Sequence, residues 1–311
     1  MSDEIGFIGL GNMGGRMTAR LVEKGRPVIG YDIRSGAAEK LGARPATSVP
    51  EVAEAADIVL LPLPDSHVVE AVTGGPGGLI AHARTGQVVV DLSTTAPSST
   101  RAIHAELAGR GAAYLDAGIS GGAAAADNGT LTLMVGGEAG TLEQVRPVLE
   151  CFSAQIFYCR ASGSGHTAKL LNNFLNAVSL SATAEVIVAG KKAGLDLEVL
   201  LAIINASSGV NFASLNRFPK IIHGDYLKGG LTNALMMKDV TLYTDLAASL
   251  GVASVNVSGP LASFGLAMGL GYADEISNTV VDAIGDVSGG VRLHQAGTEA
   301  GHSTSPDSED H

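Results

Sequence analysis

The chain has 311 residues, of which 46% are apolar and 16% are charged, so it is a globular protein long enough for two domains. Its formal net charge of −11, with no run of lysine and arginine, argues against a nucleic-acid partner. Its two cysteines are too few for a disulfide framework or a four-cysteine zinc site. Without a recognisable signal peptide or an apolar run of membrane-spanning length, we expect a cytoplasmic protein with no membrane partner.

Short apolar segments alternate with helical patterns in the first half of the chain. Most of these segments are continuously apolar, as expected when helices cover both faces of a parallel sheet. The alternation therefore predicts an α/β fold with a doubly wound sheet. The predicted strands are residues 5–10, 27–32, 57–64, 87–93, 113–120, 131–137 and 155–159.

Three glycines follow the first predicted strand in a G-x-G-x-x-G arrangement that opens a helix. Such glycines permit a tight turn, close approach of a pyrophosphate and close helix–strand packing, while the helix N-terminus binds phosphate. An acidic residue, Asp32, ends the second strand, where it would accept a hydrogen bond from a ribose 2′-hydroxyl. We therefore predict a dinucleotide site of the Rossmann type, formed by Gly9, Leu10, Gly11, Asn12, Met13, Gly14 and Asp32.

The sequence favours NAD but leaves NADP open. The Asp32 carboxylate would repel the 2′-phosphate of NADP, which favours NAD. Arg34, two residues later, could instead hold that phosphate, or it could be an ordinary solvated charge. We predict NAD as the preferred cofactor and keep Arg34 as a candidate cofactor contact.

The second half of the chain, from about residue 163, contains no convincing strand pattern. Residues 168–194 predict one long helix that ends near Gly194, and its apolar composition predicts burial on all sides as the spine of a second domain. We predict a dinucleotide-binding domain at 1–162, an all-helical domain at 163–294 and a disordered tail at 295–311. Further helices are predicted at residues 196–207, 232–251, 259–271 and 274–284.

A lysine and two asparagines interrupt the apolar pattern of the long helix. Lys169, Asn172 and Asn173 are spaced i, i+3, i+4, which places them on one helical face. They could form a functional cluster, or Lys169 could extend to water while the amides face solvent. A lysine in a first helical turn opposes the helix macrodipole, and solvated amides fit poorly in so apolar a helix, which favours the functional cluster.

Four motifs, in this order, resemble the β-hydroxyacid dehydrogenases. They are "GFIGLGNMG" (6–14), "DAGISGG" (116–122), "GSGHTAKLLNN" (163–173) and "MMKDV" (236–240). That family includes 3-hydroxyisobutyrate dehydrogenase and tartronate semialdehyde reductase. The resemblance implies a Rossmann-type domain followed by an all-α domain, with the active site between them. It also implies NAD(P)-dependent interconversion of a small 3-hydroxy acid and its 3-oxo acid by a homodimer or homotetramer.

The resemblance also assigns roles to single residues. It implies that Lys169 is the general acid/base and that Asn173 orients the substrate hydroxyl, with Asn172 beside it. It implies that Ser120, Gly121 and Gly122 hold the substrate carboxylate. Cofactor contacts implied in the same way are Leu63, Pro64, Thr94 and Lys238, and no metal is expected.

Two stretches bear on substrate identity. The family usually has Pro and Val where this chain has Gly118 and Ile119, and we expect Gly118 to loosen the segment before the carboxylate loop. By the same resemblance, residues 209–218 approach the substrate, and Asn211, Phe212 and Asn216 are candidates for shaping specificity.

Three other functions are weighed against this one. A 6-phosphogluconate dehydrogenase usually has histidine where this chain has Asn172 and has a longer helical part. Imine reductases share the fold but usually lack the lysine. A non-catalytic dinucleotide sensor or interaction protein would tend to lose the lysine too, whereas Lys169 and Asn173 are both present.

Overall fold

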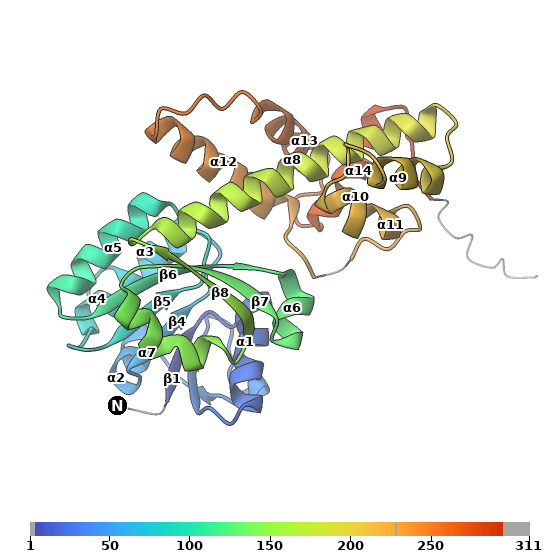
Figure 1. Ribbon diagram of the computed structural model, residues 1–311. Coiled ribbons are helices and arrows are strands. Elements are labelled where there is room, and N and C mark those ends of the chain that lie inside the picture. Colours follow the sequence, from blue (N-terminus) through green and yellow to red (C-terminus); the bar gives the residue numbers. More distant parts are fainter. Residues whose placement is uncertain (1–3, 228, 295–311) are drawn as a thin grey trace, which may run out of the picture.

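The computed structural model describes residues 4–227 and 229–294. Residues 5–160 form an eight-stranded sheet flanked by helices, and the described residues that follow are helical (Figure 1). The predicted fold class, a Rossmann-like sheet followed by a helical part, is confirmed. The predicted tail at 295–311 lies outside the described residues.

The sheet has the strand order β3-β2-β1-β4-β5-β6-β7-β8. The strand order reverses between β1 and β4, which is where ligands bind in doubly wound sheets. All neighbouring strands are parallel except β6 and β7, so the prediction of a parallel sheet misses one antiparallel pair and the two-residue β3. The strands are β1 (Ile5–Ile8), β2 (Val28–Tyr31), β3 (Arg44–Pro45), β4 (Ile58–Leu61), β5 (Val88–Asp91), β6 (Ala113–Ser120), β7 (Leu131–Gly136) and β8 (Ser153–Arg160).

Each face of the sheet has its own apolar core. Buried side chains of α1, α6 and α7 pack on one face, and those of α2, α3, α4 and α5 pack on the other. This double coverage explains why the strands are continuously apolar. The helices are α1 (Asn12–Glu23), α2 (Val49–Ala55), α3 (Ser66–Thr73), α4 (Leu79–His82), α5 (Pro97–Gly109), α6 (Gly122–Asn128) and α7 (Ala139–Leu149), with a 3-10 turn η1 (Glu39–Leu41).

The helical half is organised around α8 (Ser164–Lys192), which starts against the sheet and runs out into the other helices (Figure 1). It begins four residues before the predicted start at residue 168 and ends two residues before the predicted end at Gly194, which has φ +79°. The other elements are α9 (Leu197–Asn205), α10 (Phe212–Asn216), α11 (Phe218–Ile221), α12 (Asn233–Ser249), α13 (Ser258–Gly269), η2 (Ser277–Thr279) and α14 (Val280–Val287).

The long helix is a spine, but it is not buried on all sides. Its residues Ala177, Leu180 and Ala184 lie in the core of the helical half. On another side Leu171 and Leu175 are 46% and 66% exposed. The prediction of complete burial is therefore wrong for the single chain, because the other helices cover only part of its circumference.

Candidate active site

The loop between β1 and α1 leaves open space above a helix N-terminus. Gly9 has φ +98°, a conformation that favours glycine, and a Cβ on Gly14 would lie 1.9 Å from the Gly9 carbonyl oxygen. A Cβ on Gly11 would meet no atom within 4 Å, and Gly11 caps α1 with no side-chain hydrogen bond. Free N–H groups at this helix start and the open side of Gly11 fit the pyrophosphate of a dinucleotide.

Asp32 and Arg34 form an ion pair at the end of β2. The carboxylate accepts hydrogen bonds from the Leu10 N–H (2.7 Å), the Arg34 N–H (2.9 Å) and the Arg34 Nε (2.9 Å). Burial of Asp32 opposes its ionisation, but the hydrogen bonds from Arg34 and Leu10 outweigh this effect, so its pKa is lowered. The Arg34 side chain is 61% exposed, so it can leave Asp32 to a ribose hydroxyl.

Lys238 of α12 joins the helical half to two predicted cofactor positions. Its Nζ donates to the carbonyl oxygens of Pro64 (3.0 Å) and Thr94 (2.9 Å), which follow β4 and β5. The Leu63 N–H donates to the Ser93 hydroxyl (2.9 Å), which joins the same two loops. The structure thus brings Leu63, Pro64, Thr94 and Lys238 together at the carboxyl edge of the sheet.

The N-terminus of α8 is held by Asp116 of β6. The two oxygens of this fully buried carboxylate accept from the Gly163 N–H (2.7 Å) and the His166 N–H (2.9 Å). These groups are at the N-cap and the third position of the helix, where a carboxylate satisfies free donors and complements the helix dipole. A side chain distant in sequence therefore fixes the start of the helix that carries Lys169.

Glycines let α8 approach the sheet closely at the same place. A Cβ on Gly165 would lie 2.2 Å from the Met134 oxygen and 2.6 Å from the Asp116 oxygen. A Cβ on Gly136 would lie 2.6 Å from Asp116 Oδ1, and one on Gly118 would lie 2.5 Å from the Lys169 Cβ. We call Asp116, Gly118, Gly136 and Gly165 the α8 seat.

Gly118 does not loosen the chain as expected. It is buried within β6 and pairs with Met134 of β7. Its missing side chain instead makes room for the stem of Lys169, since any Cβ there would collide with it as α8 lies in this structure. Gly118 therefore bears on the position of the lysine stem.

Lys169 is the sixth residue of α8 and is only 8% exposed. Burial lowers the pKa of its amine to about 8, with the Asp239 charge opposing this shift and the Lys238 charge adding to it. Near neutral pH the amine can therefore exchange a proton with a bound hydroxyl, as a general acid/base must.

The two asparagines after Lys169 differ in burial. Asn173 is 4% exposed, and its Nδ2 donates to the Asp239 carboxylate. Asn172 is exposed, and its Nδ2 lies 3.5 Å from the Asn173 Oδ1. Asp239 is 1% exposed, and its Oδ1 also lies 3.1 Å from the Lys238 Nζ.

The predicted carboxylate loop begins where β6 ends. Ser120 is the last residue of β6, and Gly121 and Gly122 have φ +124° and +69°. Within the described residues the Ser120 hydroxyl has no hydrogen-bond partner, and both glycines are exposed. A hydroxyl beside two exposed glycines in a tight turn is a suitable anion-binding arrangement.

His166 belongs to the structural support of α8. It is fully buried, its Nδ1 lies 2.8 Å from the Thr95 hydroxyl and 2.7 Å from the Thr100 hydroxyl, and its Nε2 lies 3.2 Å from the Asp91 carbonyl oxygen. These contacts tie the start of α8 to β5 and α5, so His166 supports the position of this helix.

The sequence predicted no role for two residues whose side chains contact α8 in the structure. Asp116 begins the "DAGISGG" motif, and that position was its only signal. Arg217, which follows α10, lies in the predicted 209–218 stretch, but no role was predicted for it. Of the residues predicted there, Asn211 caps α10, and the Asn216 Nδ2 donates to the Phe212 carbonyl oxygen.

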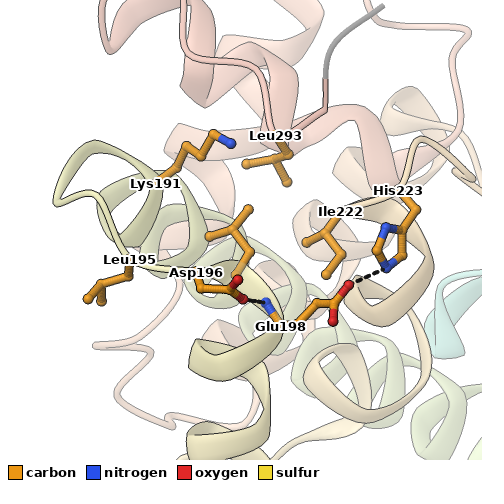
Figure 2. A pocket seen from close by; sticks show the side chains of 8 residues that line it. Lys191, Leu195, Asp196, Glu198, Ile222, His223 and Leu293 are labelled. Carbon is orange, nitrogen blue, oxygen red and sulfur yellow. Dashed lines mark hydrogen bonds and ion pairs between the residues drawn. The ribbon is translucent and has the colours of Figure 1, made fainter. Parts of the chain in front are cut away.

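A shallow hollow at the far end of α8 contains none of the predicted site residues (Figure 2). Glu198 and His223 face each other across it at 3.5 Å, and both are largely exposed. Its walls include Lys191, Ile222 and Leu293.

The family models cover both halves of the chain. The model of the NAD-binding domain of 6-phosphogluconate dehydrogenase matches residues 4–160, and that of the NAD-binding region of NADP-dependent 3-hydroxyisobutyrate dehydrogenase matches residues 163–274. The chain belongs to the β-hydroxyacid dehydrogenase family. It is accordingly an oxidoreductase that uses NAD or NADP, which excludes the non-catalytic sensor.

Relatives within this family carry different substrate names. The chain is 39% identical to the NAD-dependent L-serine dehydrogenase of Pseudomonas aeruginosa, over 87% of this chain and 94% of that protein. It is 35% identical to the 2-(hydroxymethyl)glutarate dehydrogenase of Eubacterium barkeri, over 88% of this chain and 92% of that protein. The structure of Mycobacterium tuberculosis 3-hydroxyisobutyrate dehydrogenase with L-serine superposes with a TM-score of 0.82 at 33% identity, covering 92% of this chain and 99% of that one.

Proposed function

We propose that this β-hydroxyacid dehydrogenase interconverts a 3-hydroxy acid and its 3-oxo acid, with Lys169 as the general acid/base and NAD as the preferred cofactor. The observation that carries the proposal is the buried amine of Lys169, whose pKa is lowered to about 8. An amine that titrates near neutral pH is suited to proton transfer in both directions.

Lys169 would manage the proton of the substrate hydroxyl. The bound nicotinamide supplies or accepts the hydride. In the oxidative direction the neutral amine of Lys169 takes the hydroxyl proton, and in the reductive direction its ammonium returns that proton to the carbonyl oxygen. Because burial holds the stem of Lys169 against Gly118, the amine has few positions to explore, which favours a productive geometry.

Asn173 and the loop at Ser120 would orient the substrate. The Asn173 Nδ2 is engaged with Asp239, so the amide orientation is fixed and its oxygen is turned toward other partners. The Ser120 hydroxyl and the backbone N–H groups of the exposed Gly121 and Gly122 would hold the substrate carboxylate. Asn172, exposed next to Asn173, would line the cleft.

NAD is preferred in this proposal because the Asp32 carboxylate remains ionised at the end of β2. A carboxylate there accepts from a ribose 2′-hydroxyl and repels a 2′-phosphate. Arg34 is already paired with Asp32, so it partly offsets that repulsion and leaves weak use of NADP. Lys238 would support the nicotinamide end through the Pro64 and Thr94 carbonyls.

We also infer a homodimer or homotetramer assembled through α8 and its neighbours. Leu171 and Leu175 on α8 and Phe212 on α10 are 46%, 66% and 59% exposed, which is high for large apolar side chains. The domain limits 1–162 and 163–294 belong to the same proposal, since α8 begins at Ser164.

A substrate panel with two variants tests the function. Near-ultraviolet absorbance should report NADH formation with at least one 3-hydroxy acid, and NADP should support a slower reaction. Lys169→Met should lower turnover by on the order of 10²-fold or more while NADH binding is unchanged. Lys191→Met, on the exposed last turn of the same helix, is the matched control and should retain wild-type turnover. Wild-type turnover in Lys169→Met would remove Lys169 from the mechanism.

A further inference from the structure

Arg217 is a half-buried cation for which the described residues supply no acidic partner. Its Nη1 donates to the Asn278 Oδ1 (3.0 Å) and its Nη2 to the Asn176 Oδ1 (3.0 Å). Its guanidinium lies 5.7 Å from the centre of the Phe212 ring. All of these partners are neutral, and burial lowers the pKa of Arg217 without making it neutral. Burying a charge without an opposite charge costs free energy that a ligand anion can recover.

A stripe of polar side chains on one face of α8 runs from Lys169 to the residues that contact Arg217 and α10. Lys169, Asn172, Asn176 and Thr183 follow one another at intervals of three, four and seven residues, which keeps them on one face of a helix. The segment of α10 covers the far end of this stripe, because the Asn211 Nδ2 donates to the Thr183 hydroxyl (3.1 Å). Arg217, directly after α10, contacts the stripe at Asn176, while Asn172 remains exposed.

The other partner of Arg217 connects it to the substrate side of the sheet. Asn278 lies in η2, and the neighbouring Ser277 N–H donates to the Leu231 carbonyl oxygen (2.7 Å). Two residues before Leu231, a Cβ on Gly229 would lie 3.2 Å from the Ala123 Cβ, next to the predicted carboxylate loop. Arg217 therefore lies where α8, the end of α10 and η2 meet, and a series of contacts runs from its partner in η2 to the start of α6 beside the predicted substrate loop.

We propose that Arg217 binds a second anionic group of the substrate, so that the preferred substrates are 3-hydroxy acids with another acid group at the far end. This inference rests on the proposed function. A guanidinium offers five N–H donors, of which the two asparagines use two, and the remaining donors suit the two oxygens of a carboxylate or phosphonate. The seven residues from Lys169 to Asn176 span about 10 Å of helix, so the second acid group lies beyond the reacting carbon rather than beside it.

The test compares 3-hydroxy acids of increasing length that end in a carboxylate with the matched acids that end in a carboxamide, and with one phosphonate. Wild-type protein should have a kcat/KM about 10- to 100-fold higher for the best carboxylate or phosphonate than for its carboxamide, the scale of a charge-assisted hydrogen bond. Preference between carboxylate and phosphonate then identifies the acid group.

Variants separate recognition from a purely structural role. Arg217→Met should abolish the preference by lowering kcat/KM for the acidic substrates alone, and Arg217→Lys should retain part of it. A structural role would lower kcat/KM for acidic and carboxamide substrates equally, which would overturn the proposal. The exposed Arg146→Met, in α7, is the control and should keep the wild-type preference.

Two outcomes with wild-type protein distinguish the failure of each proposal. Turnover of carboxamide-ended hydroxy acids with no preference for any acidic one would overturn the role of Arg217 and leave the dehydrogenase function intact. No turnover of any hydroxy acid with NAD or NADP, in protein that binds NADH, would overturn the proposed function itself.

Discussion

The loop of the dinucleotide site and the α8 seat both depend on glycines, but for opposite reasons. In the loop, Gly11 leaves space that a ligand can fill, since a Cβ there would meet no protein atom within 4 Å. In the α8 seat, Gly118 and Gly165 leave no space, since a Cβ on either would lie 2.5 Å or less from an atom of the protein. We expect the first kind of glycine to serve binding and the second to serve the placement of Lys169. The same substitution, glycine to alanine, should therefore have opposite effects in the two regions.

The largest effect should come from Gly165→Ala. The new methyl group would lie 2.2 Å from a backbone oxygen of β7, so α8 has to move away from the sheet. We expect the free energy of unfolding to fall by about 1–3 kcal/mol or more, with turnover lost at the same time. Thermal unfolding measures the first effect. A melting temperature equal to that of the wild type would show that α8 does not pack against β7 as closely as it does in this structure.

A smaller effect, confined to catalysis, should follow Gly118→Ala. Its methyl group would displace the Lys169 stem, whose Cβ lies 2.5 Å from the position of the new atom. We expect kcat to fall about 10- to 100-fold, because a small misplacement of a catalytic group has effects of this size, with NADH affinity unchanged. Steady-state kinetics and NADH titration together check this. An unchanged kcat would show that the position of Lys169 does not depend on Gly118.

The third effect concerns the dinucleotide loop. Gly11→Ala should leave the melting temperature unchanged, because its φ of −66° suits alanine and the methyl group faces open space. The affinity for NADH should fall about tenfold or more, since the methyl group occupies the path of the pyrophosphate. Fluorescence titration with NADH measures this. If Gly11→Ala lowered the melting temperature and left the affinity for NADH unchanged, Gly11 would act in packing, as Gly165 does, and the contrast between the two regions would be wrong.

Arg34→Met should have the smallest effect. Its ion pair with Asp32 is exposed on the arginine side, and such pairs contribute at most about 1 kcal/mol. We expect kcat/KM with NAD to change by less than about fivefold and the slower reaction with NADP to weaken further. Steady-state kinetics with NAD and with NADP measure this effect. If the wild type preferred NADP and Arg34→Met preferred NAD, the assignment of NAD would be contradicted.

The same contrast separates what the sequence could and could not predict. The dinucleotide loop is local: its strand, its glycines and the start of its helix lie within residues 5–14, and Asp32 follows the next strand, so the order of residues was enough. The fold class followed in the same way from alternating strands and helices. The α8 seat unites β6, β7 and the start of α8, and no spacing in the sequence indicates that the Asp116 carboxylate caps a helix that begins 48 residues later. Helical spacing placed Asn172 and Asn173 together, but only tertiary packing against Asp239 separates a buried amide from an exposed one. The site roles of these residues remain predictions.

The pH dependence of kcat/KM in both directions tests the central claim most directly. Because burial lowers the pKa of Lys169 to about 8, its amine is protonated below that pH and neutral above it. Oxidation of the 3-hydroxy acid needs the neutral amine, so kcat/KM for the hydroxy acid should rise with pH and level off above about pH 8. Reduction needs the ammonium, so kcat/KM for the oxo acid should fall through the same pH, and Asp239→Asn should move both transitions to lower pH because it removes the charge that raises the pKa. Profiles that are flat across this range, or that persist unchanged in the residual activity of Lys169→Met, would contradict the account.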